Sequence, residues 1–503
     1  MNRLFASFLS LSLLLASCTS PSPTPVPTTN TSTPNPDPMQ SSWDDRSPFQ
    51  KGLVTSEQSV LNELQGASVY HIELRIEDNL YQITGTEEVH YTNTEQVPLN
   101  EVEFRLFPNI LGGKMIISNL TVDDQSITPE YQLENSLMIM RLSVPLEVGQ
   151  SIIIKMNYAV TVPQEVELNY GVLAYYDDVL ALAHAYPMIC VYDDQGWNAE
   201  LPPQDGDITY SDASFYLVRV HAPKGLTLVT SGTEIQRDED GQDQILTVAN
   251  GPARDFYLVA SPKLKEVSQK FGEVTIHSYA SLDAIEGAQF ALNVASKAID
   301  VYSKRYAPYP YTELDIVATP NLALGIEYPG MVAITTRIYN VDGEYEGSSA
   351  SIYMESTVAH EVGHQWFYNL VGDDQLDDPW LDESLTQFVT LQYYTDEYGQ
   401  SGADGFEASL EGRWARVDNE KIPVGLPVAS YHGAEYGAIV YGRGPLFFVA
   451  LRDKMGTETF DTFLKEYTTS LSWKISTPEY LQSLAEQECS CNLDALFAEW
   501  IYP

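Results

Sequence analysis

Short segments in which apolar and polar residues alternate dominate the first half of the chain. A period of two is typical of strands with one buried face, and Gly, Asn, Asp and Pro at the breaks are typical of turns. We therefore expect a β-rich sandwich or saddle domain between about residues 68 and 262. The pattern predicts six strands there, over residues 69–76, 84–91, 102–107, 137–142, 152–158 and 215–221.

Helical spacing takes over from about residue 271. Residues 282–306 have the pattern of a long amphipathic helix, and residues 314–318 and 331–334 are apolar runs that predict strands. A further series of helices is expected after residue 434. Strands and helices in separate stretches are typical of the α+β class, so we expect a multidomain α+β protein with a mostly helical second domain.

One predicted helix carries several ionisable side chains. Residues 349–370 contain no Pro and are rich in large apolar residues, which predicts a largely buried helix that Gly372 would end. A second helix is expected from Asp378-Pro379, because Asp is a favoured cap and Pro a favoured first helical residue. Glu383 would lie about one turn into that second helix.

His360, Glu361 and His364 on the first helix predict a zinc site together with Glu383. Residues four apart share a helix face, so both imidazoles can bind one metal. Two His and one Glu make a three-ligand catalytic zinc site, and Glu361 would hold a metal-bound water as general base. The alternative is a chance motif on a buried helix, where these polar groups would be costly without a metal.

The stretch 360–383, HEVGHQWFYNLVGDDQLDDPWLDE, resembles the zinc signature of the aminopeptidase N and leukotriene hydrolase family of gluzincins. That family also has eighteen residues between the second His and the Glu, as this chain does. Residues 325–329, GIEYP, stand where the family carries Gly-Ala-Met-Glu-Asn, and residues 440–444, VYGRG, resemble its segment with a catalytic Tyr. The resemblance covers most of the chain from about residue 68.

The resemblance implies one Zn²⁺ per chain and further roles. Tyr441 would donate a hydrogen bond to the oxyanion, with Tyr436 as a nearby rival. Glu327 would pair with the free α-amino group of a peptide, and Gly325 would belong to the same substrate-binding strand. Arg443 would position Tyr441 or contact a substrate carbonyl, with a surface ion pair as the alternative.

Several positions depart from the family pattern. Only Glu327 of Gly-Ala-Met-Glu-Asn is kept, Gly325 is one residue nearer to it than the family's Gly, and Tyr328 replaces the Asn. The C-terminal helical domain of large members is not expected, so the chain resembles a compact bacterial relative. In the family, a polar residue of the N-terminal domain helps to hold the substrate amine. Gln195 or a nearby carboxylate in the loop 186–207 is the candidate here.

The N-terminus predicts export and a lipid anchor. Arg3 precedes a short apolar stretch, and residues 15–18, LASC, resemble a bacterial lipoprotein box with Cys18 as the lipidated residue. A cleaved signal peptide with an incidental Cys is the alternative. We expect four segments: a lipoprotein signal peptide (1–17), a Pro/Thr/Ser-rich tether (18–42), the β-rich domain (43–265) and a zinc metallopeptidase domain (266–503).

The formal net charge of −43 argues against nucleic acid as a partner and against direct adsorption to anionic lipid. Cys489 and Cys491 are predicted to be too close to pair with each other, which leaves a bond from either to Cys190 open.

We therefore expect a membrane-anchored zinc aminopeptidase at the cell surface or in the periplasm, acting on peptides. The alternatives are a thermolysin-like zinc endopeptidase and a surface binding protein with an idle zinc site.

Overall fold

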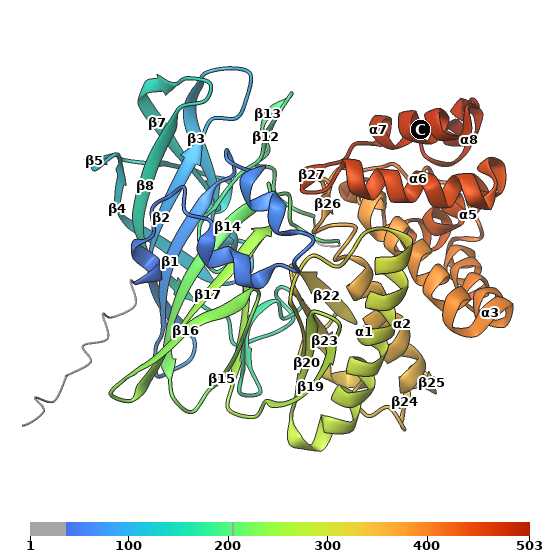
Figure 1. Ribbon diagram of the computed structural model, residues 1–503, viewed down its shortest axis with the longest axis horizontal. Helices are drawn as coiled ribbons and strands as arrows, with labels where there is room; N and C mark the ends of the chain where they lie inside the picture. Colours follow the sequence, from blue (N-terminus) through green and yellow to red (C-terminus); the bar gives the residue numbers. More distant parts are fainter. Residues whose placement is uncertain (1–36, 204–205) are drawn as a thin grey trace, which may run out of the picture. The chain divides into compact units, whose positions relative to one another are not determined.

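Strands make up most of the first half of the protein (Figure 1). The computed structural model describes residues 37–203 and 206–503, and residues 38–503 belong to one unit. The largest sheet has eight strands in the order β16 (Thr233–Asp240), β17 (Asp243–Ala253), β14 (Ser214–Pro223), β1 (Val69–Ile76), β2 (Gln82–Thr92), β8 (Ser151–Thr161), β4 (Lys114–Val122) and β5 (Gln125–Ser126).

Two four-stranded sheets and a short hairpin complete this half. One sheet has the order β15 (Thr227–Thr230), β18 (Tyr257–Ser261), β10 (Val179–Ala183), β9 (Leu173–Tyr176). The other has the order β11 (Met188–Ile189), β3 (Leu99–Arg105), β7 (Leu137–Leu146), β6 (Glu130–Gln132), and the hairpin is β12 (Tyr192–Asp193) with β13 (Gly196–Trp197).

All six predicted strands are present. The strand predicted at residues 69–76 has the observed bounds of β1, and the others correspond to β2, β3, β7, β8 and β14. Strand β1 pairs in parallel with β14 and antiparallel with β2 in the middle of the large sheet. Alternating side chains of these strands fill one apolar core, so the β-rich half has its own hydrophobic interior.

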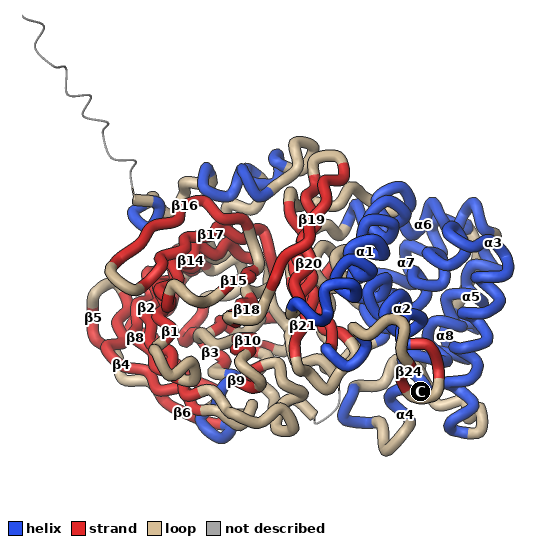
Figure 2. The backbone as a smooth tube through the Cα atoms, turned by 90° about the horizontal axis from the view of Figure 1, so that it is seen from below, coloured by secondary structure: helices blue, strands red, loops and turns tan. Residues whose placement is uncertain are grey.

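The second half combines a five-stranded sheet with helices (Figure 2). The sheet order is β19 (Lys265–Phe271), β20 (Val274–Ala280), β21 (Glu313–Thr319), β23 (Met331–Thr335), β22 (Gly325–Tyr328), so β22 is an edge strand. The predicted amphipathic helix at 282–306 is confirmed as α1. The helices are α1 (Ile285–Arg305), α2 (Ala350–Gly363), α3 (Leu385–Trp414), α4 (Glu435–Ala438), α5 (Gly444–Met455), α6 (Thr457–Ser470), α7 (Pro478–Cys489) and α8 (Asp494–Trp500).

The prediction that the motif helix runs to Gly372 is wrong. Helix α2 ends at Gly363, and Gly372 lies in β26 (Val371–Gly372), which pairs with β27 (Lys474–Ile475). Tyr368 has a φ of 130°, in the region that favours glycine, so the chain turns sharply after the helix. The second predicted helix is present, but it opens with a π-helical turn, Trp380–Ser384, before α3.

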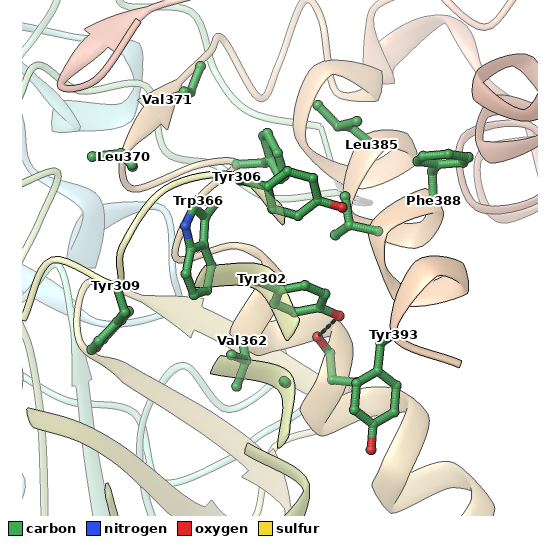
Figure 3. Close-up of a cluster of buried hydrophobic side chains, with 14 of the residues drawn as sticks. Tyr302, Tyr306, Tyr309, Val362, Trp366, Leu370, Val371, Leu385, Phe388 and Tyr393 are labelled. Carbon is green, nitrogen blue, oxygen red and sulfur yellow. Dashed lines mark hydrogen bonds between the residues drawn. The ribbon is translucent and has the colours of Figure 1, made fainter. Parts of the chain in front are cut away.

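Aromatic packing fixes α2 against its neighbours (Figure 3). Trp366 is fully buried and donates a hydrogen bond from its indole N–H to the Ala307 carbonyl at 2.7 Å. The Tyr302 hydroxyl donates to the Ala359 carbonyl at 2.9 Å, so this buried polar group is also satisfied. Burial of such side chains contributes about 1.5–3 kcal/mol each, and it fixes the motif helix against α1 and the five-stranded sheet.

Arg254 ties the two halves together. Its guanidinium is 1% exposed and donates to the carbonyls of Ser211 (3.0 Å), Asn369 (3.1 Å) and Lys474 (2.7 Å). Asn369 and Lys474 belong to the second half, on either side of the β26–β27 pair. One buried cation from the β-rich half therefore satisfies backbone groups directly after the metal-binding motif.

Cys489 and Cys491 form a disulfide, which corrects the prediction that they are too close to pair. Ser490 between them adopts a left-handed conformation with a φ of 48°, and this brings the two Cα atoms to 5.1 Å. That separation lies within the range that disulfides require. Cys190 is buried and free.

None of the helices in the described part of the chain combines the length and the apolar composition that crossing a membrane requires. The predicted signal peptide, Cys18 and most of the predicted tether lie outside the described residues.

Candidate metal centre

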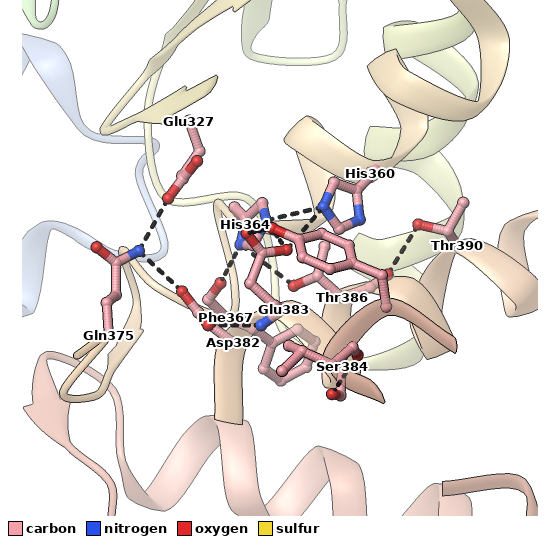
Figure 4. Close-up of polar contacts among 12 residues, drawn as sticks. Glu327, His360, His364, Phe367, Gln375, Asp382, Glu383, Ser384, Thr386 and Thr390 are labelled. Atoms are coloured by element: carbon pink, nitrogen blue, oxygen red, sulfur yellow. Dashed lines mark hydrogen bonds and ion pairs between the residues drawn. The ribbon is translucent and has the colours of Figure 1, made fainter. Parts of the chain in front are cut away.

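Three predicted metal ligands converge from two elements (Figure 4). His360 lies in the last turn of α2, His364 directly follows that helix, and Glu383 belongs to the π-helical turn before α3. His360 Nε2 is 3.1 Å from Glu383 Oε2 and 3.2 Å from His364 Nε2, and His364 Nε2 is 3.6 Å from Glu383 Oε2. All three side chains are buried.

These separations fit a zinc ion. Ligand atoms held at about 2.1 Å around a tetrahedral Zn²⁺ lie about 3.4 Å apart, close to the three distances observed. His364 Nδ1 is 2.9 Å from the Phe367 carbonyl. Donation of the Nδ1 proton to that carbonyl leaves the Nε2 lone pair directed at the other two ligands, which is the usual arrangement of metal-binding histidines.

Two of the three ligands have protonation states that suit a cation. Burial lowers the pKa of His360 to about 4, so its imidazole is neutral. Although burial favours the protonated acid, contacts with His360 and His364 hold the pKa of Glu383 well below its usual range. A neutral imidazole and a carboxylate are the forms that bind metals. For the third, His364, burial favours the neutral imidazole, but the negative charges of Glu327 and Glu383 raise its pKa well above the usual value, so it must release a proton when a metal binds.

Glu361 on α2 faces β22, the edge strand of the five-stranded sheet. Its side chain is 4% exposed, and Oε2 has no hydrogen-bond partner among the described residues. A Cβ placed on Gly325 would lie 2.3 Å from Glu361 Oε1, so the absence of a side chain on Gly325 gives this carboxylate its room beside β22. Burial raises the pKa of Glu361 well above its usual value, the direction that makes a carboxylate a stronger base.

Glu327 lies on the edge strand β22 beside the same cluster. It is 6% exposed, and ligand atoms of Glu327, Glu361 and His364 lie within 4.8 Å of one another. Burial raises the pKa of Glu327 above its usual value. A carboxylate thus stands next to the metal ligands at a sheet edge, where an extended peptide can add.

Two residues that the sequence did not single out complete this network. Gln375 donates to Glu327 Oε1 at 2.9 Å and to Asp382 Oδ2 at 2.8 Å, and Asp382 Oδ1 accepts the backbone N–H of Glu383 at 2.5 Å (Figure 4). The Asp next to the ligand in the sequence WLDE is a signal that could have pointed to Asp382. The sequence carries no comparable signal for Gln375.

A further acidic residue reaches the cluster from the β-rich half. Burial, followed by the negative charges of Glu327 and Glu383, raises the pKa of Asp207 well above its usual value, which places Asp207 beside both carboxylates. Gln195, the other candidate from this loop, is exposed, and its backbone N–H bonds to Asp193 in the β12–β13 turn. The carboxylate, and not the Gln, is therefore the residue of this loop at the site.

Tyr441 lies on a π-helical turn, Ile439–Arg443, and its hydroxyl donates to Glu383 Oε1. Its ring centroid is 6.2 Å from that of His360. The rival Tyr436 packs 5.7 Å from Tyr441, ring to ring, and its hydroxyl is buried with no partner among the described residues. Of the two, Tyr441 directly contacts a metal ligand.

Of the roles predicted for Arg443, the structure agrees only with positioning the segment that carries Tyr441. It is 1% exposed and donates to the carbonyls of Ile422 (3.0 Å), Glu499 (2.7 Å) and Trp500 (2.6 Å), with its guanidinium 4.6 Å from the Trp500 ring centroid. These bonds direct the cation to the end of the chain, so both the substrate contact and the surface ion pair are wrong. Arg443 anchors residues 499–500 against the segment that carries Tyr441.

Comparison with known proteins agrees with this geometry. Residues 290–500 match the family model "Peptidase family M1 domain". Aminopeptidase M1 of Arabidopsis thaliana is 24% identical over 301 residues, covering 57% of this chain and 33% of that protein. Endoplasmic reticulum aminopeptidase 2 of Homo sapiens is 25% identical over 222 residues, covering 43% and 23%. The chain thus spans about a third or less of the length of these curated relatives.

Solved structures cover more of the molecule. The crystal structure of an M1 zinc metallopeptidase from Deinococcus radiodurans aligns with a TM-score of 0.62 and 18% identity, over 90% of this chain and 95% of that chain. A variant of a two domain M1 zinc metallopeptidase bound to L-arginine aligns with a TM-score of 0.64 and 18% identity, over 91% and 96%. The β-rich half followed by a helical half is therefore a known fold. Residues 290–500 of this chain are therefore similar to the Peptidase family M1 domain, within a fold similar to that of the solved M1 zinc metallopeptidases.

Proposed function

We propose that the protein is a zinc-dependent aminopeptidase that removes N-terminal residues from peptides. One observation carries the proposal: the buried Glu327 carboxylate stands within 4.8 Å of ligand atoms of the general base Glu361 and of His364. A carboxylate at that place can pair with the positive α-amino group of a peptide whose first peptide bond lies at the metal. An endopeptidase has no use for such a group, because it binds the middle of a chain.

The residues divide the reaction between them. His360, His364 and Glu383 would hold Zn²⁺, which lowers the pKa of a bound water and polarises the scissile carbonyl. Glu361 takes a proton from the attacking water and later delivers it to the leaving amine. Tyr441 donates a hydrogen bond to the carbonyl oxygen as negative charge develops on it. Glu327, with Asp207 nearby, holds the ammonium group and fixes which bond is cut.

The test is hydrolysis of paired peptides with free and N-acetylated termini, with the products identified by mass spectrometry. We expect stepwise trimming of the free peptides only, loss of activity with a chelator and recovery with zinc. Glu361→Gln is the matched inactive control, because it keeps the shape of the side chain and the three ligands. Internal cuts in acetylated peptides would favour a thermolysin-like endopeptidase. Bound zinc without cleavage of any peptide would favour a binding protein.

We also propose that the protein is exported and anchored through a lipid on Cys18, which would place it at the cell surface or in the periplasm. The apolar N-terminal stretch and the sequence LASC at residues 15–18 support this. Cys18→Ser tests it directly. We expect wild-type protein in the membrane fraction and the variant in the soluble exported fraction. Equal distribution of both would rule out the anchor.

A further inference from the structure

We infer that Gln375 is a positioning residue that sets where the amino group of the substrate is held relative to the metal. The inference rests on the proposed function and deepens it. It concerns a neutral side chain that does not itself touch substrate but holds Glu327, the group that does.

Both donor bonds of Gln375 are directed at carboxylates of the site, and its acceptor bond fixes its orientation. Its amide nitrogen donates to Glu327 Oε1 (2.9 Å) and to Asp382 Oδ2 (2.8 Å), and its carbonyl oxygen accepts the Thr209 backbone N–H (3.1 Å). The side chain is 1% exposed, so water does not compete for these bonds. Because both the N–H groups and the carbonyl oxygen of this buried amide are hydrogen-bonded, the side chain is held in one orientation.

An amide is the side chain that this place requires. Glu327 and Asp382 repel each other, and two N–H donors on one nitrogen offset that repulsion. A Lys or Arg here would neutralise Glu327 and compete with the substrate ammonium for it. An apolar side chain would leave both carboxylates without this donor. The neutral amide fixes Glu327 and leaves its negative charge available to the peptide.

The bonds beyond Gln375 connect the amine anchor to the metal centre. Asp382, which accepts one amide proton, also accepts the backbone N–H of the metal ligand Glu383 at 2.5 Å. Gln375 therefore fixes the position of Glu327 relative to Glu383, the candidate zinc ligand. Because a 1 Å displacement in an active site costs much of the rate, this link matters for cutting at the first peptide bond.

Thr209 adds a contribution from the β-rich half. It lies two residues after Asp207, and its side-chain oxygen is 3.3 Å from His184 Nε2, which in turn is 3.0 Å from Asp255 Oδ2. Tyr368, just after the metal motif, donates to the same Asp255 oxygen at 2.8 Å. The orientation of Gln375 is thus supported by buried polar contacts from both halves.

The experiment compares two zinc-binding probes that differ only in the amino group: leucine hydroxamate and its des-amino analogue, 4-methylpentanohydroxamate. Their affinities for the zinc-loaded full chain are measured by titration calorimetry for wild type and for Gln375→Met. We expect wild type to prefer the amino compound. In the variant we expect the affinity for that compound to fall at least tenfold, while the affinity for the des-amino compound stays the same.

Gln392→Met is the matched control, since Gln392 is another buried Gln of the second half, bonded to Tyr306 instead of the site. It should keep the wild-type preference. Gln375→Asn keeps the amide but shortens its reach, and it should show the same selective loss if Gln375→Met folds poorly. In a Glu327→Gln background, Gln375→Met should have little further effect on the preference, because Gln375 acts through Glu327.

The outcomes separate the two proposals. If wild type does not prefer the amino compound, the aminopeptidase proposal fails and this inference fails with it. If wild type prefers it but Gln375→Met and Gln375→Asn keep that preference, the inference alone is overturned. An equal fall for both probes, or loss of bound zinc, would also overturn it, because Gln375 would then be only a structural residue.

Discussion

The contact between Gly325 and Glu361 shows how narrowly the site is built at the scale of single residues. A Cβ on Gly325 would lie 2.3 Å from Glu361 Oε1, so in this structure a larger residue would force the Glu361 side chain to shift. The sequence placed Gly325 in the substrate-binding strand through the family resemblance. The structure adds a reason that involves the base: the missing side chain makes room for the carboxylate.

Gly325→Ala should therefore inactivate the enzyme although no functional group is removed. The new methyl displaces Glu361 from the water that it activates, and we expect turnover to fall about 10²-fold or more, the typical contribution of a general base. Peptide hydrolysis measures this, with bound zinc determined as the control. Wild-type turnover in a zinc-loaded Gly325→Ala variant would contradict this role of the glycine.

Tyr441→Phe should reduce kcat by about 10²–10³-fold, because it removes one hydrogen-bond donor to the developing oxyanion. Tyr436→Phe is the matched control, since it removes the hydroxyl of the neighbouring Tyr, which lacks a partner among the described residues. Steady-state kinetics of both variants decide between the two tyrosines. A larger loss in Tyr436→Phe would reverse the assignment.

The ligands and the base could be predicted from the sequence, and their supports could not. Helix geometry brings His360 and His364 together, because residues four apart share one face of a helix, and Glu361 is the next residue along. Gln375 and Thr209 are 166 positions apart, and no local pattern links them. Asp207 was one of several carboxylates in a long loop, and only the packing of that loop against the second half selects it.

At the scale of elements, the predictions succeeded where a regular apolar pattern extends over many residues. The predicted end of a helix was wrong where a turn depends on tertiary contacts. Strand β1 and helix α1 have clear patterns, and both are present. The end of α2 was misplaced because the apolar residues after Gly363 looked helical. In the structure Trp366 and Phe367 fill the core from a turn instead, and Tyr368 accepts an unfavourable backbone angle there.

The element that carries Tyr441 depends on Arg443. Arg443→Met should lower the free energy of unfolding by about 2–3 kcal/mol, because partly buried carbonyls of residues 422, 499 and 500 lose their donor and the Arg443 site loses its cation. We expect KM for small peptides to stay unchanged, since the guanidinium points to the C-terminal segment. Arg416→Met, at an exposed position, is the control for denaturant unfolding. A raised KM without loss of stability would restore the substrate contact.

Glu87 makes the large sheet sensitive to pH. It is fully buried in β2, both its carboxylate oxygens lack partners among the described residues, and burial raises its pKa well above the usual value. The native protein keeps this group protonated where the unfolded chain, with a Glu pKa of about 4.3, releases the proton. Stability from this group is therefore complete at lower pH and declines as pH rises above that value.

Glu87→Met should remove this decline. We expect the variant to be more stable than wild type by about 1–3 kcal/mol at pH 8, because a buried polar group without a partner is lost. The gain in stability should shrink towards pH 5. There the Glu87 carboxyl stays protonated in the native protein and is protonated in a larger fraction of the unfolded chains than at pH 8. Urea unfolding at the two pH values measures both effects. A gain that is independent of pH would contradict the titration.

At the scale of the whole molecule, metal binding should stabilise the folded state in addition to supporting the reaction. The ligands come from α2 with the residue that follows it and from the turn before α3, so an ion joins two elements that both pack into the core of the second half. Chelation should lower the Tm measured by calorimetry, and added zinc should restore it. At a free zinc concentration of 1,000 times Kd, binding raises the free energy of unfolding by about 4 kcal/mol. An unchanged Tm after complete removal of zinc would argue against this site.

The anchoring of residues 499–500 by Arg443 has a consequence for the order of assembly during synthesis. A ribosome makes about 5–20 residues per second, and the β-rich half emerges and folds first. The segment with Tyr441 cannot be locked until the carbonyls of Glu499 and Trp500 have been translated. A nascent chain would therefore carry all its candidate metal ligands before the segment with Tyr441 gains this support from residues 499–500.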